Sequence, residues 1–160
     1  MDKSNDEKRK IGEKKFIEWL DKRKIPYMYF DQSFKTFSKK FLYLLKRPDF
    51  MILIPNLGFI FVDVKNHTIY KNRSGETIAF DIDEIKKFKK LHKKFGVQIW
   101  FAVCHESDLY KNWDWISINE IEETDKKEVA RLDGKEFYTP QLRKFIRISI
   151  EEGIGKLFEK

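Results

Sequence analysis

The sequence has very little cysteine, and it lacks both long apolar runs and an apolar leader. Cys104 is the one cysteine among 160 residues, so neither an internal disulfide nor a zinc site built from several cysteines can form. No apolar run reaches the length of a membrane span, and the first residues, MDKSNDEKRK, have no signal-peptide core. We therefore expect a protein of a reducing, cytoplasmic compartment that has no membrane partner.

The chain is rich in apolar, aromatic and basic residues. Hydrophobic residues make up 41% and aromatic residues 16% of the sequence, which favours a packed globular protein over a disordered one. The length fits one domain over residues 1–160. The formal net charge is +7 and the isoelectric point is about 9.3, so a polyanionic partner such as nucleic acid is plausible.

The hydrophobic pattern predicts helices and buried strands in alternation. Apolar residues recur at helical spacing over 6–24 and over 82–95, and Gly96 is a typical helix stop. The expected strands are 27–30, 48–54, 58–65, 97–104 and 113–118, with a further short one near 77–80. A helix between two buried strands requires a crossover and a parallel pair. The predicted fold is α/β, a mixed central sheet flanked by helices, with its core at about 7–104 and additional elements over 105–160.

Two segments have less regular patterns. Residues 33–47 contain no acid, and they are typical of either a loop or an irregular strand. Their basic residues and aromatic residues alternate: Lys35, Lys39, Lys40, Lys46 and Arg47 with Phe34, Phe37, Phe41 and Tyr43. Near the end of the chain, Thr139 and Pro140 favour the start of a last helix, with threonine as the cap and proline at the first position.

The most hydrophobic stretch, residues 47–68, contains charged residues at both ends. Side chains alternate along a strand, so Asp63 and Lys65 point to the same face. If the turn sets Ile54 opposite Gly58, Asp49 lies directly across from Asp63, whereas a slip of one residue puts Asp49 on the other face. Asp49 and Lys65 could also simply mark strand ends, with Asp63 in a buried ion pair.

Facing carboxylates repel each other and stay ionised only with a cation between them. Lys65 supplies one positive charge, but Mg²⁺ (or Mn²⁺) held by one or two carboxylates and water does more. Such an ion acidifies water and offsets charge on a phosphate, and Lys65 could orient or deprotonate that water. Glu13 lies at helical spacing with Phe16 and Leu20, so we expect a third acid to point from the first helix toward this face.

Arg47-Pro48-Asp49, the apolar hairpin and Asp63-Val64-Lys65 together resemble the PD-(D/E)xK nuclease motif. The resemblance covers residues 12 to about 104, and it implies the αβββαβ core of restriction endonucleases and archaeal Holliday-junction resolvases. It further implies that Asp49, Asp63 and the Val64 carbonyl bind Mg²⁺, that Lys65 acts on the attacking water, and that Glu13 is an accessory acid. Resolvases often have a glutamine near the start of the second helix, where this chain has Glu84 and Lys86.

The substrate is expected to approach along the basic residues that precede the motif. The candidate substrate contacts are Lys46, Arg47 and, on the second helix, Lys86. Basic side chains that neutralise phosphates give an affinity that does not depend on the base sequence of the nucleic acid. Most lysines of that helix are equally typical of a solvated face. His67 is a second candidate for a phosphate contact, or a surface histidine, whereas we expect His92 to be structural. A pair of Cys104 and His105 as nucleophile and base is disfavoured, because neighbours on a strand point to opposite faces.

The sequence therefore predicts a Mg²⁺-dependent endonuclease that hydrolyses DNA phosphodiester bonds, with RNA as an alternative substrate. A homodimer would suit the cutting of both strands. Two alternatives remain at this point: a nucleic-acid-binding module of the same fold that does not cleave, and an α/β domain in which the motif is coincidental.

Overall fold

The computed structural model describes residues 3–30, 33, 35, 37–73, 75–122 and 134–159, except for the side chains of 42–44 and 122. Its α-helices are α1 (Asn5–Lys22), α2 (Lys39–Leu44), α3 (Ile82–Phe95) and α4 (Ile118–Glu122). Its 3₁₀ turns are η2 (Glu106–Asp108), η3 (Leu142–Lys144) and η4 (Ile154–Phe158). In this described part of the chain, no helix is both long enough and apolar enough to cross a membrane.

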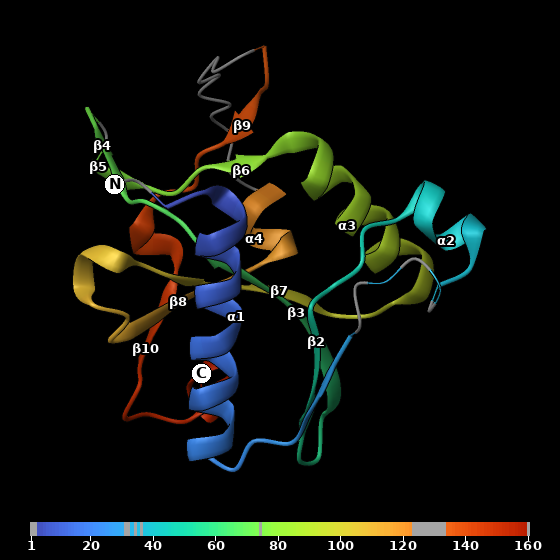
Figure 1. Ribbon diagram of the computed structural model, residues 1–160, viewed down its shortest axis with the longest axis horizontal. Helices are drawn as coiled ribbons and strands as arrows, with labels where there is room; N and C mark the ends of the chain where they lie inside the picture. Colours follow the sequence, from blue (N-terminus) through green and yellow to red (C-terminus); the bar gives the residue numbers. More distant parts are fainter. Residues whose placement is uncertain are drawn as a thin grey trace.

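Six strands form one mixed sheet in the order β1-β2-β3-β7-β8-β10 (Figure 1). These strands are β1 (Tyr27–Tyr29), β2 (Phe50–Ile54), β3 (Gly58–Asn66), β7 (Ile99–Cys104), β8 (Asn112–Ser117) and β10 (Ile146–Ser149). The pair β3–β7 is parallel and the others are antiparallel, so the predicted crossover through α3 is confirmed. Short strands form two small ladders, β4 (Tyr70–Asn72) with β5 (Gly75–Thr77) and β6 (Phe80–Asp81) with β9 (Phe137–Tyr138).

Helix α1 covers one face of the sheet and builds the first core. Ser4 begins the helix with a capping box, in which its side chain and that of Glu7 each accept the other's backbone amide. Phe16 is fully buried, and its ring centroid lies 5.0 Å from those of Phe50 and Trp113. Gly12 allows the helix to approach closely, because a Cβ there would lie 3.3 Å from the Cβ of Asn66.

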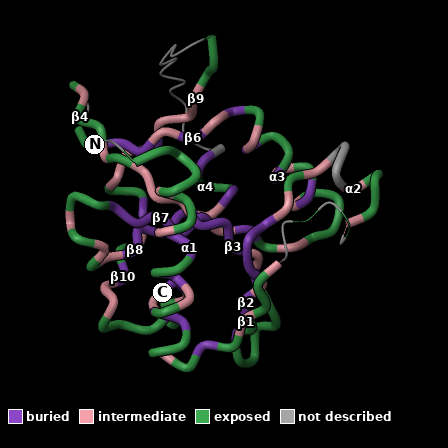
Figure 2. Tube along the Cα trace, viewed as in Figure 1, coloured by how far each residue is buried: buried purple, intermediate pink, exposed green. Residues whose placement is uncertain are grey.

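Helices α3 and α4 cover the opposite face and build the second core. Ile85, Phe88 and Leu91 of α3 are buried there together with Phe101 of β7. Helix α3 ends at Gly96, which has the left-handed φ of 65° that favours glycine. The sheet therefore lies between two hydrophobic layers, and its central strands are among the buried parts in Figure 2.

Two expectations from the sequence are wrong. Residues 39–44 form helix α2 and not a loop or irregular strand, because Ser38 caps the helix and Phe41 and Leu45 pack against the second core. No helix starts at Thr139 and Pro140 in the described range 134–159. In this range the 3₁₀ turn η3 is followed by strand β10, because pairing of β10 with β8 buries Ile148. Phe34, one of the aromatic residues that alternate with basic residues in 33–47, lies outside the described residues.

The contacts of Phe16 predict a large loss of stability on truncation. We expect Phe16→Ala to lower the free energy of unfolding by about 3–5 kcal/mol, because the cavity would lie between α1 and four aromatic rings. Urea denaturation measures the change. The matched control is Phe95→Ala at the exposed end of α3, which should stay within about 0.5 kcal/mol of the parent chain. Equal losses in the two variants would contradict this packing.

Candidate active site

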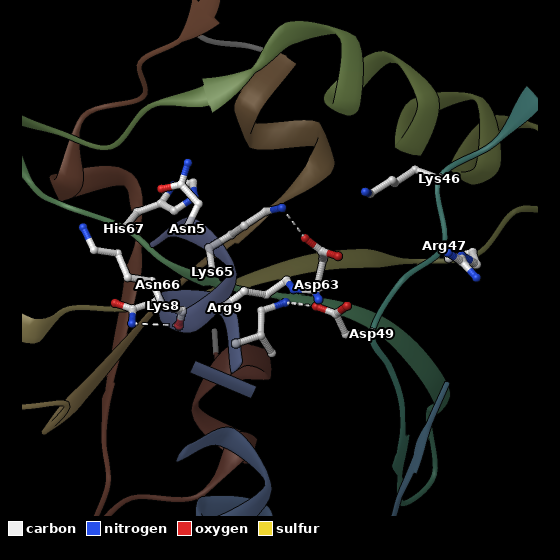
Figure 3. A pocket seen from close by; sticks show the side chains of 11 residues that line it. Asn5, Lys8, Arg9, Lys46, Arg47, Asp49, Asp63, Lys65, Asn66 and His67 are labelled. Carbon is white, nitrogen blue, oxygen red and sulfur yellow. Dashed lines mark hydrogen bonds and ion pairs between the residues drawn. The ribbon is translucent and has the colours of Figure 1, made fainter. Parts of the chain in front are cut away.

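The β2–β3 hairpin brings Asp49 and Asp63 to one side of the sheet. Phe50 pairs with Val62 and Ile54 with Gly58, so the predicted register is confirmed. Asp49 itself leaves the ladder: its backbone amide donates to the Val62 carbonyl at 3.1 Å, and its side-chain Oδ2 accepts from the Val64 amide at 2.8 Å. Both carboxylates line the same cavity (Figure 3).

This cavity has a volume of about 330 Å³ and combines buried acids with a basic rim. Its walls come from α1, from the segment before β2, and from the end of β3. The lining residues are Asn5, Lys8, Arg9, Lys46, Arg47, Asp49, Asp63, Val64, Lys65, Asn66 and His67. Asn66 joins two of these walls, since its amide nitrogen donates to the Lys8 carbonyl at 3.0 Å. Carboxylates at the base of the cavity can bind a metal ion, and the basic side chains around them can bind a phosphate group that approaches with it.

Lys65 lies between two carboxylates. Its Nζ is 2.7 Å from Oδ2 of Asp63 and also forms a short ion pair with Glu84. Burial alone would lower the pKa of Lys65, but the two carboxylates outweigh burial and raise the pKa above its usual value. Lys65 is therefore a fixed ammonium group in this arrangement.

The two aspartates differ from ordinary surface carboxylates. Burial, and then the charge of Asp63, raise the pKa of Asp49 well above its usual range, and the Val64 amide offsets only part of that effect. Burial also raises the pKa of Asp63, although Lys65 acts in the opposite direction. Two buried acids that resist ionisation favour an added cation, because a cation stabilises both charged forms.

The available oxygens fit a hard divalent ion that keeps much of its water shell. Oδ1 of Asp49 accepts no hydrogen bond from the described residues, whereas its Oδ2 accepts the Val64 amide. Oδ2 of Asp63 is buried without a hydrogen-bond partner among the described residues, although it forms an ion pair with the Lys65 ammonium at 2.7 Å. Within the described ranges, no group of three or more Asp, Glu, His or Cys side chains could hold a metal ion. Two carboxylates completed by a carbonyl and water match the way in which proteins bind Mg²⁺.

Glu13 is on the inward side of α1, as predicted, but it does not line the cavity. Its Oε2 accepts from the Tyr29 hydroxyl at 2.7 Å, and its Oε1 is buried without a hydrogen-bond partner among the described residues. Burial, followed by the contact with Glu13, raises the pKa of Tyr29 to about 12. The charge of Glu13 also contributes to the raised pKa of Asp49.

The three basic residues predicted to contact substrate have different positions. Lys46 is exposed on the cavity wall, and in Figure 3 its amine points toward the pair formed by Lys65 and Asp63. Arg47 also lines the cavity, but its guanidinium donates to the Ser33 carbonyl at 3.3 Å. Lys86 is exposed on α3 and is not part of the lining.

Glu84 is a site residue that sequence reasoning did not assign. Asp81 caps α3 by accepting the amides of Asp83 and Glu84, so the first turn of the helix projects Glu84 toward β3. Lys65 then lowers the pKa of Glu84 despite the burial of that carboxyl. An acid three residues after a capping aspartate was a usable sequence signal, but its partner Lys65 lies on the other side of the β-hairpin-to-helix connection.

A buried network supports the end of β3. His105 has one ring nitrogen 2.7 Å from the His67 carbonyl and the other 2.9 Å from Oδ2 of Asp114. Arg147 donates twice to Asp114, each time at 2.9 Å. Because a carbonyl and a carboxylate both accept, each nitrogen of His105 has to donate, which requires the imidazolium form. Although burial opposes the charge, the bond with Asp114 raises the pKa of His105.

The histidines and the cysteine differ in their surroundings. His67 is half-buried in the cavity lining, and burial lowers its pKa to about 4, so the ring is neutral at pH 7. His92 contacts the Val97 carbonyl at 2.6 Å, which is a structural role as expected. Cys104 is buried in the first core, and burial raises its pKa to about 12, whereas His105 contacts Asp114.

Comparison with solved structures gives the fold a name. Hjc, a Holliday junction resolvase from the archaeon Archaeoglobus fulgidus, superposes with a TM-score of 0.52 at 13% identity, over 88% of this chain and 95% of its own. D212, a nuclease from a fusselovirus, also gives 0.52 at 13% identity, over 98% of this chain and 92% of its own. The chain has the restriction-endonuclease-like fold. No family model and no curated protein matches its sequence.

The His105 network predicts a pH dependence of stability. The pKa of His105 is raised by folding, so its contribution is fully present below about pH 6.5 and is lost as the pH rises through the folded pKa. We expect His105→Gln to cost about 1–3 kcal/mol at pH 6, since buried partners lose a donor. Urea denaturation between pH 6 and pH 9 should show that the difference from the parent chain narrows. Parallel curves would contradict the charged form of His105.

Proposed function

We propose that this protein is a nuclease that hydrolyses DNA phosphodiester bonds with the help of Mg²⁺ or Mn²⁺. One observation carries the proposal: Asp49, Asp63 and Lys65 line a single cavity with basic residues at its rim. The restriction-endonuclease-like fold supports it, as do the functions of the neighbouring structures, a resolvase and a nuclease. Fold alone does not determine chemistry, so the proposal depends on the cavity.

The carboxylates of Asp49 and Asp63 would hold the ion, together with the Val64 carbonyl. When bound, a divalent ion supplies positive charge against the phosphate and acidifies water. The Val64 amide fixes Asp49, and Lys65 fixes Asp63, so both carboxylates are positioned before any ligand arrives. Charged groups that are positioned in advance in this way usually make the largest single contribution to the stabilisation of a transition state.

Lys65 would act as a donor and not as a proton acceptor. Its ammonium is held by Asp63 and Glu84, and both of them raise its pKa. A fixed ammonium beside the aspartates can orient the attacking water or bind a non-bridging phosphate oxygen. Lys46, exposed at the same rim, would neutralise a flanking phosphate, whereas Arg47 would position the chain that carries it.

Two observations favour the alternative, a module that binds nucleic acid without cutting it. Lys65 is already occupied by two carboxylates, and Glu13 does not line the cavity to complete a set of three acids. A basic cavity of this kind could bind phosphate without hydrolysing it. The two functions differ in whether bond cleavage depends on Asp63 and Lys65.

Plasmid nicking tests the nuclease directly. We expect the parent chain to relax supercoiled DNA in Mg²⁺ or Mn²⁺ and to lose this activity in EDTA. Asp63→Asn and Lys65→Gln should each lower the rate at least about 100-fold, because each removes a charge fixed at the reacting phosphate. The matched control, Lys111→Gln, changes an exposed lysine outside the cavity and should cut like the parent chain.

Binding assays on the same variants separate the two functions. If the parent chain binds DNA but never nicks it in either metal, the non-cleaving module is correct. If nicking persists at the parental rate in Asp63→Asn, with circular dichroism showing a folded variant, the cavity is not the active site.

Asp49 allows a test of ion binding that does not depend on activity. Because folding raises the pKa of Asp49, its ionised form costs stability at pH 7, and Asn keeps the acceptor for the Val64 amide. Without metal, we expect Asp49→Asn to raise Tm by at least about 2 °C, the shift that corresponds to 1 kcal/mol. With Mg²⁺, Tm of the parent chain should rise with concentration, and that of the variant should not. A variant stabilised equally by Mg²⁺ would place the ion elsewhere.

A further inference from the structure

The outer end of the β2–β3 hairpin exposes apolar side chains on the same face as the acids. Phe59, Phe61 and Asp63 alternate along β3 and point to one side, whereas Ile60 and Val62 are buried under α1. The Phe59 side chain is 44% exposed, whereas Ile60 and Val62 on the opposite face of β3 are buried. At the usual rise per residue, Phe61 lies about 7 Å and Phe59 about 13 Å from Asp63 along the strand.

Neighbouring strands extend this face into a patch. Leu53 pairs with Phe59, Met51 with Phe61, and Met28 of β1 with Met51. Leu53 is 43% and Met28 53% exposed. We call these residues the outer-hairpin patch: Met28, Met51, Leu53, Phe59 and Phe61. A contiguous apolar patch on a folded surface is typical of a binding site.

Aromatic rings connect the patch to the basic segment. Ring centroids lie 5.5 Å apart for Phe59 and Phe61, and 5.9 Å apart for Phe61 and Phe30. The series continues from Phe30 to Phe37 at 6.4 Å, and the guanidinium carbon of Arg47 lies 5.0 Å from the centroid of the Phe37 ring. The patch is therefore continuous with the wall that carries Lys46 and Arg47 at the candidate active site.

The chemistry around the patch indicates one occupant. Residues 33–47 contain five basic residues and no acid, so two copies of this chain packed through the patch would bring like charges together. A polyanion with flat apolar groups fits instead, since phosphates pair with the lysines while bases stack on exposed rings. In a duplex, the faces of the bases are already stacked on each other, so the complementary ligand is an unpaired strand.

We propose that the outer-hairpin patch binds unpaired nucleobases by stacking on Phe59, which guides single-stranded or locally opened nucleic acid toward Asp63 and Lys65. This inference rests on the proposed nuclease and names its substrate class. It gives Phe59 a role in binding and none in bond cleavage.

Fluorescence anisotropy in EDTA tests the patch without any cleavage. The probes are a labelled oligothymidylate, an abasic strand of equal length, and a blunt duplex. The parent chain should bind oligothymidylate more tightly than the abasic strand. Phe59→Ala should weaken oligothymidylate binding about tenfold or more, and should change binding of the abasic strand and the duplex less than about twofold, because stacking on a ring requires a base.

Matched variants separate stacking from general effects. Phe59→Trp should retain tight binding, and Phe59→Leu should lose it although the site stays apolar. Leu109→Ala removes an apolar side chain that is 73% exposed on the turn after η2, and should behave like the parent chain. All these positions are at the surface, so the variants are expected to fold.

Two results would overturn the proposal. One is unchanged oligothymidylate binding in Phe59→Ala, or an equal loss for all three probes. The other is light scattering that shows a dimeric parent chain and a monomeric Phe59→Ala, which would make the patch an interface between two copies. The binding test can still be carried out if the protein does not nick plasmid DNA. If the protein nicks DNA but Phe59→Ala binds oligothymidylate normally, only the stacking proposal is refuted and the proposed nuclease activity stands.

Discussion

The hydrogen bond from the Val64 amide to the Asp49 carboxylate determines the geometry of the site. The β2–β3 ladder ends at the pair Phe50–Val62, and beyond it the Asp49 side chain takes the place of a backbone carbonyl as the acceptor for the Val64 amide. The two strands can therefore separate here without leaving that amide unsatisfied. The same bond holds Asp49 near Asp63 in a buried position. Burial and the charge of Asp63 raise the pKa of Asp49, and burial and the charge of Glu84 raise the pKa of Asp63. Lys65 offsets only part of that cost. Behind the basic rim, the carboxylates of Asp49, Asp63 and Glu84 therefore share one ammonium group, that of Lys65, which is the physical basis for expecting a further cation there.

The elements around the hairpin keep this unfavourable arrangement in place. Helix α1 approaches β3 closely at Gly12, and the Asn66 side chain bonds to the Lys8 carbonyl of that helix. On the opposite side, α3 contributes Glu84 to Lys65. Behind the site, His105 joins the end of β3 to Asp114 of β8. A crossover fold suits this purpose, because it brings a helix start and two strand ends to one edge of the sheet.

Much of this arrangement could be predicted from sequence because it depends on local periodicity. Alternation along the strand places Asp63 and Lys65 on one face, and the turn at 55–58 favours the register that brings Asp49 to the same cavity. The partners that were missed lie far away in sequence: Glu84 reaches Lys65 only after the crossover, and Arg147 reaches Asp114 only through the pairing of β10 with β8. Helix α2 was missed because its basic and aromatic residues lack the usual helical stripe, and packing on the second core supplies its stability instead.

The face that carries Asp63 and Lys65 changes character along its length. Near the turn it is apolar and exposed at Phe59, and at the far end it is charged and enclosed. Anomalous scattering from a crystal of the protein soaked in Mn²⁺ would locate the ion. We expect one strong peak within about 2.0–2.3 Å of oxygens from both Asp49 and Asp63. A peak bound elsewhere, or carboxylates that point to opposite sides of the sheet, would contradict this expectation.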